Sequence, residues 1–187
     1  MLYFPVLKLV RQHRRFFLGT ALAGLVLRLF FFVYFPAVTD DSRIYVDIAI
    51  NWLQHGIYGT TQSGQIVATD ERLPGYPGFL TAVFALFGPA SFRAVMVLQI
   101  LLDLGTCFLI ADLARRSVSD RAAQVAFVLA ALCPFLANYS AAALTETLEI
   151  FFTAVALNYA VAALDRLDQG QVHWKAWGGS GFATAAC

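Results

Sequence analysis

Charge is scarce in this sequence: Asp, Glu, Lys and Arg together make up 13% of its 187 residues, whereas 59% are hydrophobic. So little charge and so much apolar character exclude an ordinary soluble domain and are typical of a polytopic membrane protein. The formal net charge is only +1. Because nucleic-acid binding requires a basic surplus, this balance predicts no nucleic-acid partner. Membrane lipids are the partners that the composition implies.

Cysteine and histidine are also scarce, at three residues each. They lie far apart, at His13, His55, Cys107, Cys133, His173 and Cys187. Neither residue type has the short spacing of a zinc or disulfide motif, so the sequence predicts no metal site built from these residues. The chain also lacks internal repeats and low-complexity tracts.

Long apolar runs are what the sequence does contain. The first, residues 16–35, is about 20 residues long, and at ~1.5 Å per residue it matches the hydrocarbon core of a bilayer. A basic leader precedes it and contains Lys8, Arg11, Arg14 and Arg15. No small-residue cleavage site follows the run, so we expect a retained anchor whose basic N-terminal side stays in the cytoplasm.

The apolar segment 74–87 decides the topology. It is only about 14 residues long and contains Pro74 and Pro77 at its start, so it is expected to lie at the membrane interface without crossing. Further spans are then predicted at 93–114, 122–138 and 145–164, with an incomplete one at 176–187. In this topology most Lys and Arg residues are cytoplasmic, whereas a crossing at 74–87 would move the arginine cluster at 115–121 outside.

The expected fold class is therefore all-α: a polytopic transmembrane helical bundle with a non-cytoplasmic loop, residues 36–92, that carries juxtamembrane helices. The last apolar segment stops after about half a membrane thickness, and a helix cut there cannot span. Residues 1–187 are thus expected to form the N-terminal part of a longer transmembrane domain, integral to the membrane.

Two adjacent carboxylates, Asp40 and Asp41, directly follow the first span and open an amphipathic stretch that ends at Gly56. Its apolar residues recur one helical turn apart, at Ile44, Tyr45, Ile48, Ala49, Trp52 and Leu53. Its polar residues fall on the other face, at Arg43, Asp47, Asn51 and Gln54. The pattern predicts a helix on the membrane surface, capped by Asp40, Asp41 or Ser42 and stopped by Gly56. We interpret the two acids, held at the membrane–water boundary, as an active-site element.

Four short motifs lie in the outer loop and at the outer end of the predicted span 145–164. They are Asp41-Ser-Arg-Ile-Tyr45, Gly56-Ile-Tyr58, Arg72-Leu-Pro-Gly-Tyr-Pro77 and Leu144-Thr-Glu-Thr147. In this order they resemble the GT-C class of membrane glycosyltransferases, and within it the branch that contains protein O-mannosyltransferases and the lipid A aminoarabinose transferase. That branch often has Asp-Glu at the catalytic position, whereas here Asp41 is followed by Ser42 and preceded by Asp40.

The resemblance implies a membrane glycosyltransferase that moves a hexosyl or pentosyl group from a polyprenyl-phosphate donor. The acceptor would be a lipid, glycan or protein on the non-cytoplasmic side, and the membrane would be the bacterial plasma (inner) membrane. An acceptor hydroxyl needs a base within hydrogen-bond reach, and the resemblance assigns that role to Asp41. Asp40 and Glu146 are the supporting catalytic candidates, although a cap of the surface helix is an alternative role for Asp41.

The candidates for substrate binding are Tyr45, Arg72, Tyr76 and Arg93. Of these, Arg72 or Arg93 would neutralise the departing phosphate. No organic cofactor is implied. A divalent cation held through oxygen ligands by Asp40, Asp41 and Glu146 stays an alternative.

Two other functions stay open: a transporter or lipid flippase, and a non-catalytic membrane subunit. A transporter should show repeat symmetry and helices broken near mid-membrane. The sequence shows no repeat, and Pro134 is expected near a helix end, so the glycosyltransferase is the preferred interpretation.

Arg28 and Asp103 are single charges deep within predicted spans, a position that is costly unless each finds a partner. Counted at ~1.5 Å per residue from the outer ends of their spans, they lie at nearly the same depth. The sequence predicts that they pair across two helices in a structural role, with Glu149 as the rival partner of Arg28.

Overall fold

The computed structural model describes residues 6–167 and 174–185. These residues form nine helices and one antiparallel two-stranded hairpin. In chain order the elements are α1 (Val6–Gln12), α2 (Arg14–Tyr34), α3 (Asp40–His55), β1 (Gly59–Gln62), β2 (Gln65–Ala68), α4 (Gly75–Phe87), α5 (Phe92–Ser117), α6 (Asp120–Ala131), α7 (Pro134–Ser140), α8 (Glu146–Leu167) and α9 (Trp174–Ala185).

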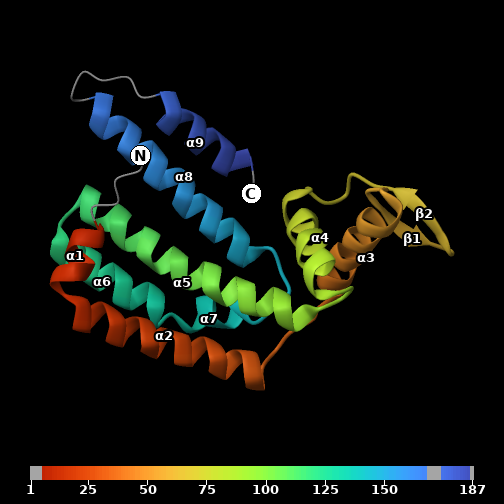
Figure 1. The fold of residues 1–187 in the computed structure, drawn as a ribbon, viewed down its shortest axis with the longest axis horizontal. Helices are drawn as coiled ribbons and strands as arrows, with labels where there is room; N and C mark the ends of the chain where they lie inside the picture. Colours follow the sequence, from red (N-terminus) through yellow and green to blue (C-terminus); the bar gives the residue numbers. More distant parts are fainter. Residues whose placement is uncertain (1–5, 168–173, 186–187) are drawn as a thin grey trace.

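Three of these helices, α2, α5 and α8, are long and apolar enough to cross a membrane. They pack with the α6–α7 pair into a bundle, and α3, the hairpin and α4 gather at one end of it (Figure 1). The expected all-α membrane bundle is confirmed. Where an incomplete last span was expected, α9 lies along α8, while residues 186–187 of that predicted segment lie outside the described residues.

The predicted span 122–138 is covered by two helices, and its crossing of the membrane as one broken span stays a prediction. It consists of α6 and α7, which are bent by 52° at a short break. Pro134 is the first residue of α7, where its missing N–H is not needed. The preceding Cys133 is extended, at φ −70° and ψ 115°, because the residue before a proline avoids the helical region. Pro134 therefore lies at a helix end, as predicted, but inside the apolar segment.

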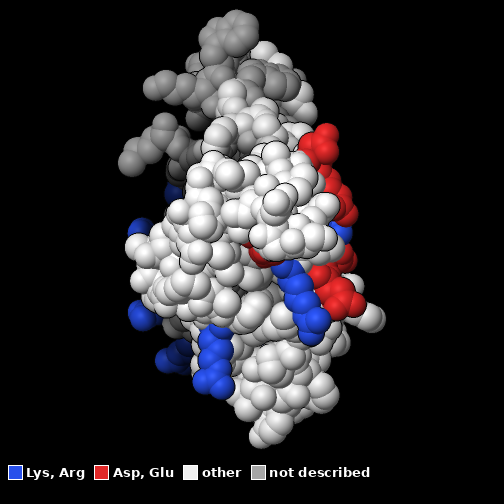
Figure 2. Space-filling view, turned by 90° about the vertical axis from the view of Figure 1, so that its right-hand side faces the viewer, with Lys and Arg blue, Asp and Glu red and all other residues white. Residues whose placement is uncertain are grey.

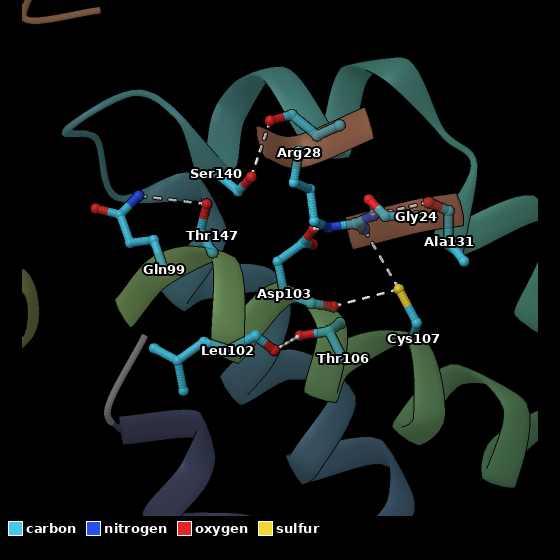
Figure 3. A network of polar contacts seen from close by, with 11 residues as sticks. Gly24, Arg28, Gln99, Leu102, Asp103, Thr106, Cys107, Ala131, Ser140 and Thr147 are labelled. Carbon is cyan, nitrogen blue, oxygen red and sulfur yellow. Dashed lines mark hydrogen bonds and ion pairs between the residues drawn. The ribbon is translucent and has the colours of Figure 1, made fainter. Parts of the chain in front are cut away.

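The predicted ion pair between Arg28 and Asp103 is confirmed. The Arg28 Nε donates to Asp103 Oδ2 at 2.6 Å, and both side chains are buried. The Arg28 Nη1 also donates to two carbonyls, those of Gly24 at 2.9 Å and Ala131 at 2.7 Å (Figure 3). Because Ala131 is the last residue of α6, the guanidinium also binds a buried backbone carbonyl at the point where the helix is interrupted.

The surface helix α3 begins and ends close to the predicted residues, but its cap differs. Thr39 is the N-cap and forms a reciprocal capping box with Ser42, so neither aspartate caps the helix. The Thr39 hydroxyl accepts from the Ser42 N–H, and the Ser42 hydroxyl accepts from the Thr39 N–H. Neither carboxylate in the first turn is therefore needed as a cap. Gly56 ends the helix in the left-handed conformation at φ 70°, as predicted.

The predicted polar face of α3 is not a solvated face throughout. Asn51 is buried and donates to the carbonyl of Gly59 at 3.0 Å. The Asp47 carboxylate accepts from the backbone N–H of Thr61 at 2.6 Å and from its hydroxyl at 2.9 Å. These contacts fix the β1–β2 hairpin on α3. This hairpin was not predicted from the sequence.

A local signal for the hairpin does exist. Ser63 and Gly64 both have positive φ, at 50° and 81°, which is the backbone of a two-residue type I′ turn. Gly59 is required at the other end because a Cβ there would collide with the Val67 backbone carbonyl. A Ser-Gly pair between short Thr-, Ile- and Val-containing segments is therefore the pattern that predicts this hairpin.

Helix α4 has 13 residues and falls short of membrane length, as expected for segment 74–87. Pro74 is its N-cap and Pro77 lies in its first turn, where neither removes a hydrogen bond that the helix needs. The helix packs against α3. Their shared core also includes residues of α5 and α8, and its buried members are Val46, Ala49, Tyr76, Leu80, Val83, Phe84, Val95 and Leu148.

Candidate active site

Asp41 and Arg72 form an ion pair at the end of the bundle that carries α3 and α4. The Nη2 of Arg72 lies 2.7 Å from Asp41 Oδ1, and their side chains are 29% and 60% exposed. The Arg72 guanidinium also lies over the ring of Tyr45, 5.3 Å from its centroid. Three of the predicted site residues, from α3 and from the loop before α4, are thus brought together by the fold.

The Gly56-Ile-Tyr58 motif positions this arginine. The Tyr58 hydroxyl donates to the backbone carbonyl of Arg72 at 2.7 Å. The Tyr58 ring packs edge-on against Trp52 of α3, with ring centroids 5.3 Å apart. Because Gly56 turns the chain sharply after α3, Tyr58 returns to the same side as the helix. The motif therefore positions Arg72 indirectly, because Tyr58 holds the loop before α4.

Beside the ion pair lies a pocket of about 220 Å³. It is enclosed by one residue of α3, the loop before α4, the first turn of α4 and the start of α8. Its lining residues are Tyr45, Glu71, Arg72, Leu73, Tyr76, Thr145, Leu148 and Glu149. A pocket with an arginine, two carboxylates and two aromatic rings can accept a polar ligand that carries negative charge at one end.

The two tyrosines of the pocket differ in what their hydroxyls can do. Their rings pack edge-on, with centroids 5.1 Å apart. Burial raises the pKa of Tyr45, and the positive charge of Arg72 only partly offsets this, so Tyr45 is a hydrogen-bond donor at neutral pH. Burial and the negative charge of Glu146 raise the pKa of Tyr76 as well. The Tyr76 hydroxyl is already used, because it donates to Gln99 Oε1 at 3.1 Å.

Glu146 and Glu149 occupy different positions around this pocket. Glu149 lines it, whereas Glu146, the predicted catalytic candidate, is the first residue of α8 and does not. One oxygen of Glu146, Oε2, is buried without a hydrogen-bond partner among the described residues. The charge of Glu146 nevertheless acts on the buried Tyr76.

Asp40 and Arg93 lie away from this arrangement. The Asp40 side chain is 99% exposed and only approaches Arg43, at 3.7 Å. Arg93 lies near the start of α5, in a separate hollow that is also lined by Phe87, Ala90, Ser91, Phe92 and Ala94. Within residues 6–167 and 174–185, no three His, Cys, Asp or Glu side chains come close enough to hold a metal ion. The fold therefore does not assemble Asp40, Asp41 and Glu146 into the alternative cation site.

The space-filling view along the bundle shows the surface of this end. Acidic side chains run along one margin, and a basic side chain lies directly beside them on a largely uncharged face (Figure 2). Gln99, which contacts the site from α5, was not among the residues predicted from the sequence. A polar residue within a predicted span is the pattern that could have identified Gln99, as it identified Asp103.

Comparison with known proteins supplies one match. The family model of dolichyl-phosphate-mannose-protein mannosyltransferase matches residues 72–187, more than half of the chain. No curated protein and no solved structure matches. The matched region begins at Arg72 and includes the start of α8, whereas Asp41 lies before it. The chain therefore belongs to the dolichyl-phosphate-mannose-protein mannosyltransferase family, a family of GT-C-type membrane glycosyltransferases that use a polyprenyl-phosphate sugar donor.

Proposed function

We propose that this chain carries the part of a glycosyltransferase active site that holds the donor phosphate and activates the acceptor. The observation that carries the proposal is the 2.7 Å contact between Asp41 and Arg72 beside a pocket built from α3, α4 and α8. A base next to a phosphate-binding cation is the pair of groups that transfer from a sugar phosphate requires. We place the protein in the branch of protein O-mannosyltransferases and the lipid A aminoarabinose transferase.

In this proposal the acceptor hydroxyl oxygen forms a bond to the anomeric carbon while the bond from that carbon to the donor phosphate breaks. The hydroxyl proton passes to Asp41, and the phosphate departs with the bonding electron pair. The Arg72 guanidinium has five N–H donors, and Asp41 accepts from its Nη2. Its positive charge and its other N–H groups stabilise the departing phosphate. Tyr45, protonated at neutral pH, donates a hydrogen bond to the donor. Lipid, glycan and protein hydroxyls are all acceptors for this chemistry.

Arg72 offers the first test. In the full-length protein, Arg72→Gln is expected to lower kcat/KM for a polyprenyl-phosphate sugar about 10- to 100-fold, since a hydrogen bond to a charged group contributes about 1.5–3 kcal/mol. Arg43→Gln is the matched control, because Arg43 is exposed on the same helix turn as Asp41 and lies outside the pocket. Equal kinetics of the two variants would remove Arg72 from phosphate binding.

The side of the membrane is also part of the proposal. Figure 1 shows α1, which belongs to the basic leader, and α3, which carries Asp41, at opposite ends of α2; this supports a cytoplasmic N-terminus and a non-cytoplasmic site. In a background without native cysteines, Gln62→Cys on the hairpin should react with a membrane-impermeant thiol reagent in intact cells. Val118→Cys, at the other end of α5, should react only after permeabilisation. Reaction of both in intact cells would contradict this topology.

A transporter or lipid flippase is the second candidate, and one observation favours it. The 52° break between α6 and α7 is the kind of interruption found in transport proteins. Incubation of the reconstituted protein with a labelled polyprenyl-phosphate sugar separates the two functions. A transferase moves the label covalently to the acceptor, whereas a flippase moves the intact lipid between leaflets. A non-catalytic subunit would do neither alone.

A further inference from the structure

Gln99 is a polar side chain that the transfer chemistry does not use. It belongs to α5, and its residue is 0% exposed. Its Oε1 accepts from the Tyr76 hydroxyl at 3.1 Å. Its Nε2 donates to the carbonyl of Ala142 at 2.8 Å. The same Nε2 lies 3.4 Å from the Thr147 hydroxyl, a contact drawn in Figure 3. Both ends of the amide are thus engaged: Oε1 contacts Tyr76, which lines the pocket, and Nε2 contacts residues close in sequence to the lining residues Thr145 and Leu148.

The physical reason for this amide lies in the segment 141–145. This segment joins α7 to α8 without regular structure, and within it the Ala142 carbonyl accepts from the nearby Leu144 N–H at 2.9 Å. Gln99 Nε2 is a second donor to this carbonyl, at 2.8 Å, and unlike the Leu144 N–H it comes from another element, α5. It therefore ties the segment to α5, which an apolar residue at the same position cannot do.

The same segment is bound from a second side by the chain that leads to Asp41. The Ala37 N–H donates to the Ala141 carbonyl at 3.1 Å, and the Ala143 N–H donates to the Ala37 carbonyl at 3.0 Å. These two bonds form an isolated parallel bridge between Ala37 and Ala142. The chain segments that lead into α3 and α8, the helices that carry Asp41 and Glu149, are therefore joined through their backbones.

We propose that Gln99 is a positioning residue of the active site, an inference that rests on the proposed function. It links Tyr76, whose ring packs on Tyr45, to the segment that presents Thr145 and Glu149 to the pocket. It thereby sets the separation of the two walls between which the donor binds. Gln99 itself does not line the pocket. Its effect passes through Tyr76 and the segment 141–145.

The kinetic test compares Gln99→Met with Thr106→Val in the full-length protein. Methionine has nearly the length of glutamine but forms none of the three contacts. Thr106 is the control, since it is buried on the same helix but donates only to its own helix, at the Leu102 carbonyl. For Gln99→Met we expect a KM for the donor raised about tenfold and a lower kcat per folded protein. Thr106→Val should stay within about twofold of the wild type.

Tyr76→Phe keeps the test decisive if Gln99→Met does not fold. It removes the same contact from the other end and leaves both Nε2 contacts of Gln99 in place. We expect a several-fold higher KM for the donor. Wild-type kcat and KM for the folded fraction of both variants, whatever their expression level, would overturn the positioning role.

A second readout is independent of activity. Thr145→Cys places a thiol in the pocket wall, and its reaction rate with a small thiol reagent reports how firmly the segment 141–145 is held. The rate should rise several-fold when Gln99→Met is added and stay unchanged with Thr106→Val. An unchanged rate with Gln99→Met would overturn the inference. If the wild type transfers no sugar, the proposed function fails, while this rate still decides whether Gln99 holds the segment.

Discussion

Asp41→Asn in the full-length enzyme is expected to lower sugar transfer by about 10²- to 10⁴-fold, the range for a positioned general base. This loss corresponds to ~3–5 kcal/mol of the activation barrier. Asparagine keeps the size of the side chain but cannot accept the hydroxyl proton. Because Thr39 and Ser42 form the capping box of α3, the substitution leaves the helix start intact. The measurement is transfer from a polyprenyl-phosphate sugar in membranes, normalised to protein level.

Asp40→Asn is the matched control for this substitution. Asp40 lies in the same helix turn, but its side chain is 99% exposed and has only a long contact with Arg43. Near-normal transfer is expected. The opposite pattern, an inactive Asp40 variant with an active Asp41 variant, would assign the base to Asp40. Normal transfer by both would remove this turn from the chemistry and leave Glu149 as the carboxylate to test.

Arg28→Met is expected to destabilise the protein by ~3–5 kcal/mol, because it leaves the Asp103 carboxylate buried without its partner. The same change removes the donor to the Ala131 carbonyl at the break between α6 and α7. Both losses occur where water cannot replace the missing hydrogen bonds. The measurement is the thermal or denaturant midpoint of the detergent-solubilised protein, followed by a signal from the helices.

The double variant Arg28→Met with Asp103→Leu separates the ion pair from other effects. Removing both charges should recover part of the stability lost in Arg28→Met, since no unpaired charge remains buried. Arg43→Gln is the negative control because its pair with Asp40 is exposed on both sides. A single variant as stable as the wild type, or a double variant no more stable than Arg28→Met, would contradict the proposed role of this pair.

The sequence alone determined the features that depend on composition, length and single costly residues. Apolar runs of membrane length are expected to form helices because the bilayer satisfies no backbone hydrogen bonds, and three helices long and apolar enough to cross a membrane, α2, α5 and α8, are found at three of the predicted spans. Gly56 stops α3 because a left-handed residue there needs no Cβ. Arg28 and Asp103 pair because two charges at one depth in lipid have few other partners.

Only the tertiary structure decided how these elements form a site. The N-cap of α3 was mispredicted because several neighbouring residues can cap a helix, and the geometry of the entering chain selects Thr39. Asn51 and Asp47 were predicted to lie on the polar face of α3, but both bind the hairpin that packs there. The contacts of Asp41 with Arg72 and of Gln99 with Ala142 join residues 31 and 43 positions apart. Such contacts depend on packing between helices, and no local sequence signal determines which side chains meet there.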